Sequence, residues 1–60
     1  MPLGADPEAN MKELRASAEI PGTRMYELRQ KYDEAKFEKI VEAAGYDEAR
    51  RHGWVETADA

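Results

Sequence analysis

The chain has 60 residues, with 13 acidic and 9 basic side chains, a net charge of −4, one histidine and no cysteine. This composition excludes disulfide bonds, leaves a tetrahedral zinc site without a ligand set, and disfavours nonspecific binding to nucleic-acid phosphates. A chain of this length buries only about 60% of its unfolded surface, so we expect a thin core that needs association with a partner for stability.

The first predicted helix covers residues 7–18. Asp6 can accept hydrogen bonds from the free amides of the first turn, and Pro7 suits the first helical position. The apolar residues of this helix are spaced three and four apart and form one stripe. They are Met11, Leu14 and Ala18.

A proline and a glycine then break the chain, because proline lacks an amide donor and keeps the residue before it out of the helical region. We expect Ile20, which precedes Pro21, to fold back onto the core. Thr23 can cap a second helix, and good helix formers without an internal Gly or Pro follow over residues 24–44.

The segment 24–44 carries two apolar stripes about 140° apart around a helix axis. One stripe consists of Met25, Leu28, Tyr32 and Ala35, and the other of Tyr26, Phe37, Ile40, Val41 and Ala44. In one interpretation the helix breaks near Asp33 and both stripes enter one core. In the other the helix is continuous and offers one stripe to a partner. We favour the continuous helix, because no residue between Lys31 and Glu34 forces a break.

On this interpretation one stripe belongs to the core and the other to a protein partner. Phe37, Ile40, Val41 and Ala44 share their face with the end of the helix, so we assign them to the core. The partner-binding assignment therefore falls on the other stripe, in which Met and Tyr are residue types enriched at interfaces. Its members are Met25, Leu28, Tyr32 and Ala35.

We expect Gly45 to end the helix in a left-handed conformation, with Tyr46 packed back on the last turn. Asp47 would then cap a short third helix over residues 48–52. The same glycine-aromatic step recurs at Gly53 and Trp54, so we predict a second glycine helix stop at Gly53. We predict that Trp54 is an apolar anchor in folding or in partner binding.

These elements predict an all-α fold, a small module of two or three helices that a partner completes. We divide the chain into an N-terminal arm (1–5), a single helical module (6–55) and a polar tail (56–60).

No residue pattern indicates catalysis, a cofactor or a metal site. The chain has one serine, Ser17, and its one histidine, His52, lies among arginines rather than beside an acid. The paired carboxylates fall at predicted helix starts, where acidic residues are favoured for structural reasons. Arg50, Arg51 and His52 beside Trp54 form the densest basic cluster, which we interpret as a solvated helix end. Its use by a nucleic acid is the alternative.

No apolar run approaches the roughly 20 residues that span a bilayer, and the first residues lack the basic flank and apolar stretch of a secretory signal. We therefore expect a protein without a membrane segment that is not secreted by a signal peptide.

The opening MPLGADPEANMKEL resembles the start of a group of very short uncharacterised proteins encoded by bacteriophages and prophages, which share a Pro-Leu-Gly, an Asp-Pro and Asn-Met-Lys-Glu-Leu. The resemblance covers residues 1–14 only, because the lysine-rich middle and the basic end of that group are absent here. It implies a phage origin and no particular activity.

Together these observations predict a non-enzymatic interaction or structural protein, a minor component of a phage virion that binds a larger protein assembly or copies of itself. The alternative is a small phage regulator in the host cytoplasm, which inhibits a host protein or binds nucleic acid weakly.

Overall fold

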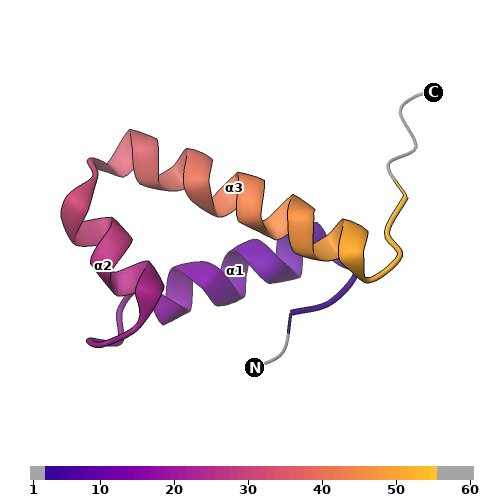
Figure 1. Ribbon diagram of the computed structural model, residues 1–60, viewed down its shortest axis with the longest axis horizontal. Coiled ribbons are helices and arrows are strands. Elements are labelled where there is room, and N and C mark those ends of the chain that lie inside the picture. Colours follow the sequence, from indigo (N-terminus) through magenta and orange to yellow (C-terminus); the bar gives the residue numbers. More distant parts are fainter. Residues whose placement is uncertain (1–2, 56–60) are drawn as a thin grey trace.

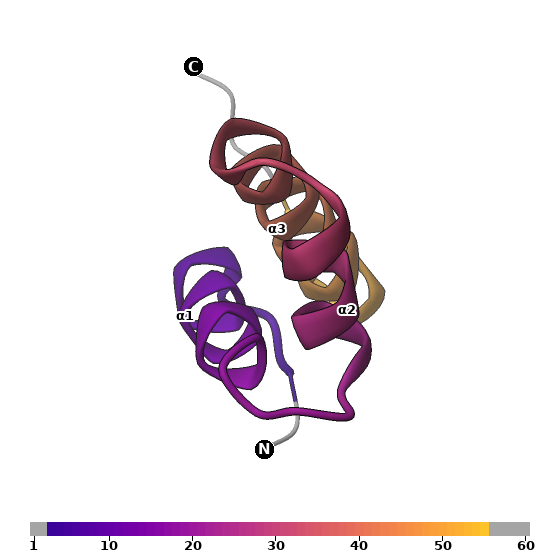
Figure 2. The ribbon, with the colours of Figure 1, turned by 90° about the vertical axis from the view of Figure 1, so that its left-hand side faces the viewer.

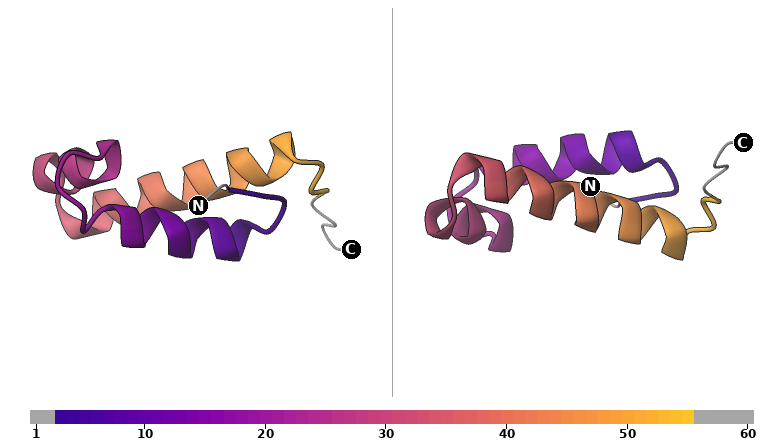
Figure 3. Two further views of the ribbon diagram at one scale, coloured as in Figure 1. Left: turned by 90° about the horizontal axis from the view of Figure 1, so that it is seen from below. Right: turned by 90° about the horizontal axis from the view of Figure 1, so that it is seen from above.

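The computed structural model describes residues 3–55, which form three helices: α1 (Pro7–Ser17), α2 (Arg24–Lys31) and α3 (Glu34–Arg51). No strand occurs within this range, so the predicted all-α fold is confirmed. In Figure 1, α1 and α3 run in opposite directions along the length of the molecule, and α2 crosses between them at one end. Seen from below and from above, α1 and α3 lie side by side (Figure 3).

α1 begins where the sequence predicts. The carboxylate of Asp6 accepts hydrogen bonds from the amides of Glu8 and Ala9 at 3.1 and 3.4 Å, and Pro7 occupies the first turn. The helix ends at Ser17, one residue before the predicted boundary.

The connection to α2 is a tight turn that contains Gly22 at φ +94°. The Thr23 hydroxyl accepts from the amide of Tyr26 at 3.1 Å and donates to the carbonyl of Ser17 at 2.8 Å, which confirms Thr23 as the cap of α2. Ile20 does not fold back onto the core, because the turn directs its side chain outward and leaves it 57% exposed.

The predicted continuous helix over 24–44 is wrong, and the interpretation with a break near Asp33 is correct. α2 ends at Lys31, Tyr32 and Asp33 are extended, and Asp33 caps α3 by accepting from the amide of Lys36 at 2.8 Å. Burial explains the break, since two apolar stripes so far apart face one core only if the chain turns between them.

α3 continues through Gly45, so the predicted helix end at Gly45 and the separate helix over 48–52 capped by Asp47 are also wrong. The buried residues of α3 recur every fourth position, at Phe37, Val41, Gly45 and Ala49. A Cβ at position 45 would lie 2.8 Å from the Met11 Cγ and 3.3 Å from the Pro7 carbonyl oxygen. Gly45 is therefore a point where α1 and α3 cross in close contact.

The glycine that ends α3 is Gly53, at φ +96°. The amide of Trp54 donates to the carbonyl of Ala49 at 2.9 Å, and the amide of Gly53 donates to the backbone carbonyl of Arg50 at 3.1 Å. These two bonds form a Schellman motif, which satisfies carbonyls of the last turn. The second predicted glycine stop is therefore confirmed.

The core lies where the three helices meet. Its buried apolar residues are Met11, Ala18, Met25, Phe37 and Val41, with Leu14, Leu28 and Tyr46 packed against them. In the end view of Figure 2, α1, α2 and α3 lie on three sides of a common centre. α1 and α3 diverge toward α2 (Figure 1), and Phe37 of α3 and Met25 of α2 are both buried in the core.

Candidate protein-interaction site

An apolar groove with a volume of about 350 Å³ opens between the three helices and the N-terminal arm. Its apolar lining consists of Leu3, Leu14, Met25, Leu28, Ile40 and Ala44. Its charged rim consists of Arg24, Asp47, Glu48 and Arg51. An apolar concave surface with a charged rim is the composition typical of a protein-binding site.

The groove exists because α2 is short. Its 8 residues extend for about 12 Å, whereas the 18 residues of α3 extend for about 27 Å. α2 is therefore less than half as long as α3 and cannot cover its whole length. Along the remaining length of α3, the side chains of Ile40 and Ala44 are only half-buried.

The arm forms one wall of the groove because Asn10 holds it. The Asn10 amide donates to the Gly4 carbonyl at 2.7 Å, and the Gly4 amide donates back to the Asn10 side-chain oxygen at 2.8 Å. This pair fixes the backbone next to Leu3, which lines the groove together with Leu14. On its other side Leu3 borders a second shallow depression, which reaches the exposed Ile20.

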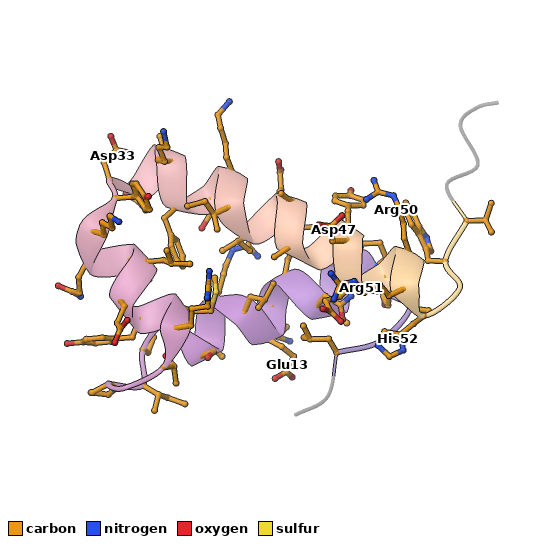
Figure 4. All side chains as sticks on the ribbon, viewed as in Figure 1. Glu13, Asp33, Asp47, Arg50, Arg51 and His52 are labelled. Carbon is orange, nitrogen blue, oxygen red and sulfur yellow. The ribbon has the colours of Figure 1, made fainter. Side chains whose placement is uncertain are left out.

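The rim is electrostatically uneven. At the C-terminal end of α3, Arg51 pairs with Glu48 at 3.2 Å and Asp47 pairs with Arg50 at 3.3 Å. Figure 4 shows Asp47 and Arg51 in the C-terminal half of α3, far from Asp33 at its start. Arg24, on α2, is exposed and forms no ion pair within residues 3–55.

A further ion pair joins α1 to α3. The Arg15 guanidinium lies 2.9 Å from the Glu38 carboxylate, and both side chains are nearly half exposed. Its hydrogen bonds to Glu38 raise the pKa of Arg15 and hold the pKa of Glu38 below its usual value. This pair fixes the relative position of the helices rather than lining the groove.

The partner stripe assigned from the sequence does not lie on one free surface. Met25 is 8% exposed and belongs to the core, and Leu28 packs against that core, so their assignment away from the core is corrected. The break at Asp33 is the cause, because it turns α2 inward. Both residues nevertheless contribute to the groove.

The other assigned partner residues lie elsewhere. Tyr32 is in the turn between α2 and α3, with the ammonium groups of Lys31 and Lys36 at 5.5 and 5.7 Å from its ring centre. Ala35 is exposed on the outer face of α3. Trp54 is half-buried, with its ring centre 5.4 Å from that of Tyr46. Binding of a partner by these three residues stays a prediction.

Sequence reasoning missed three contributors to the groove. Ile40 and Ala44 were assigned wholly to the core, whereas each is half-buried and lines the opening. Leu3 fell in a segment interpreted only as an arm. The Asn10 side chain, which fixes Leu3 through Gly4, bonds across six residues, and no periodic pattern signals such a contact.

The basic side chains at the C-terminal end of α3 lie beside acidic side chains. Glu48 accepts a hydrogen bond from Arg51 and lies 3.8 Å from the His52 ring, and Arg50 pairs with Asp47 (Figure 4). The Arg50 guanidinium also lies 5.9 Å from the ring centre of Tyr46. Phosphate groups approaching this cluster would therefore meet carboxylates as well as guanidinium groups.

Within the part of the chain that the structure describes, no cluster of three or more His, Asp or Glu side chains is placed to hold a metal ion. No helix among these residues is both long and apolar enough to cross a bilayer. Comparisons with protein families, curated proteins and solved structures found no match to the chain.

Proposed function

We propose that this chain is a non-enzymatic module that binds a larger protein through the groove between its three helices. The observation that carries the proposal is the apolar lining that α2 is too short to cover. At roughly 25 cal/mol per Å², covering such side chains stabilises both the complex and the fold of a chain whose own core is small.

The biological setting that we propose follows from the resemblance of residues 1–14 to the start of short phage and prophage proteins. The larger protein is then a component of a phage particle, and this chain is a minor structural protein of that particle. Mass spectrometry of purified particles tests this setting. A fixed ratio of this chain to the major particle proteins supports it, and absence from particles during infection contradicts it. Absence would favour the small regulator instead.

Two adjacent alanines provide a matched test of the groove. Ala44 lines the groove and is half-buried, whereas Ala43 is exposed and lies outside it. Lysine is a good helix former, so either substitution preserves α3, while Ala44→Lys places an ammonium group against the apolar lining.

The measurement is the amount of partner, identified by mass spectrometry, that co-purifies with each tagged variant from infected cells. We expect Ala44→Lys to lose the partner and Ala43→Lys to retain it. Equal retention by both variants, each with the helix content of the wild type, would contradict the proposal that the groove is the binding site.

A further inference from the structure

The groove has a shape and a polarity that select one kind of occupant. We propose that the partner enters it as an amphipathic α-helix, which lies along α3 and places an acidic C-terminal turn beside Arg24. This inference rests on the proposed function, because it names the structure and the charge of the segment that the groove binds.

The secondary structure of the occupant follows from hydrogen bonding. Residues 3–55 form helices and turns only, so the groove offers no strand edge to which an extended peptide could add. The groove lining is apolar side chains, against which the backbone of an extended peptide would lose its hydrogen bonds to water. A helix forms the hydrogen bonds of its backbone internally, and it presents apolar side chains at intervals of three and four residues.

The length of the groove agrees with this occupant. Along α3 the lining and the rim extend from Ile40 to Arg51, which corresponds to about 16 Å at 1.5 Å per residue. A helix of about three turns covers that distance. It would occupy the position beside α1 and α3 that α2 leaves empty.

Charge sets the direction of the helix. Arg24 is the cation of the rim at the α2 end of the groove, and it lacks an ion-pair partner within the described residues. At the other end, on the C-terminal half of α3, Asp47 is paired with Arg50 and Glu48 with Arg51, so the charges there largely balance. The C-terminus of a helix carries partial negative charge and its N-terminus partial positive charge. The C-terminus of the occupant is therefore the end that matches Arg24.

The experiment uses a displayed library of helical peptides of about 14 residues, roughly 21 Å long. Apolar residues are fixed at intervals of three and four, and the first and last turns vary among Glu, Gln and Lys. The library is sorted for binding to the full chain. The wild type, Arg24→Glu, Ala44→Lys and Ala43→Lys are used in parallel, after circular dichroism has shown that each retains its helix content.

We expect the wild type to enrich peptides with Glu in the last turn by about fivefold over Lys, the size of a surface charge pair, and Arg24→Glu to reverse this preference. Ala44→Lys should abolish enrichment, and Ala43→Lys should not. Enrichment that ignores the charge at position 24 would overturn the proposed direction. If no helical peptide is enriched, the helical occupant is wrong. The proposed function would then survive only if Ala44→Lys still loses the native partner.

Discussion

The side chain of Asn10 donates a hydrogen bond of 3.0 Å to the carbonyl of Gly45, at the point where α1 and α3 cross. Asn10 is only 2% exposed and makes two further bonds to the backbone of Gly4. One buried amide therefore joins both long helices to the arm that carries Leu3. The stability of the fold and the shape of the groove depend on the same side chain.

We predict that Asn10→Ala lowers the free energy of unfolding by about 1–3 kcal/mol, because it leaves buried backbone groups of the arm and of α3 without a partner. Asn10→Asp should be at least as destabilising at neutral pH, since its carboxylate would face the carbonyl oxygens of Gly4 and Gly45. Urea unfolding followed by circular dichroism measures both changes. Wild-type stability in either variant would show that the network contributes little.

Gly45→Ala tests the close crossing of the helices. Helix propensity alone predicts that this substitution stabilises the protein by about 1 kcal/mol. The added Cβ would lie 2.8 Å from the Met11 Cγ and 3.3 Å from the Pro7 carbonyl oxygen, so we predict a net loss of about 1–3 kcal/mol instead.

Ala43→Gly is the control for Gly45→Ala, because position 43 is exposed and should report helix propensity only. We expect this control to lose about 1 kcal/mol. Thermal or urea unfolding measures the change in stability caused by Gly45→Ala. The sign of this change shows whether packing or helix propensity dominates at position 45. A more stable Gly45→Ala variant would contradict the crossing at this residue.

Local signals allowed much of the fold to be predicted. Asp6 with Pro7, Thr23, and Gly53 each act through neighbouring backbone groups, and each was correctly assigned. Gly45 was misassigned because a glycine followed by an aromatic residue also occurs at helix ends. The spacing of Val41, Gly45 and Ala49, four residues apart, was the signal for a close helix crossing instead.

The break at Asp33 depends on tertiary contacts. Good helix formers lie on both sides of it, so local propensity favours one long helix. The extended pair Tyr32 and Asp33 is stabilised because it brings Met25 and Phe37 into one core. A single sequence does not show which of two apolar stripes has a neighbour, so the groove was predicted only in part, through Met25 and Leu28.

Gly53→Ala should destabilise the end of α3 by about 1 kcal/mol, because an L side chain is strained at φ +96°. The Schellman bonds place Trp54 beside Tyr46, so the substitution should also change the environment of the indole ring. Trp54 fluorescence and thermal unfolding measure the two effects. An unchanged emission spectrum together with wild-type stability would argue against this helix end.

The ion pair of Arg15 and Glu38 should make stability depend on pH. Arg15 holds the pKa of Glu38 below its usual value, so the ionised carboxylate is favoured in the folded state. The resulting stability is present above the ordinary glutamate pKa of about 4.3 and is lost as the pH falls through the lower pKa of the folded state.

Arg15→Gln should therefore lower the melting temperature slightly at neutral pH, and the difference from the wild type should shrink as the pH falls below about 4. Thermal unfolding between neutral and acidic pH measures this difference, and added salt should reduce it at neutral pH. A difference that is constant across this range would contradict the assigned role of the pair.

The most direct test of the groove as the binding site is photo-crosslinking in infected cells from two neighbouring positions of α3. A photoreactive amino acid replaces Ala44, which lines the groove, or Ala43, which is exposed and lines a separate depression on α3 instead. We predict a discrete adduct to one larger protein from position 44 and none from position 43. Equal adducts from both positions, or an adduct from position 43 alone, would contradict the account.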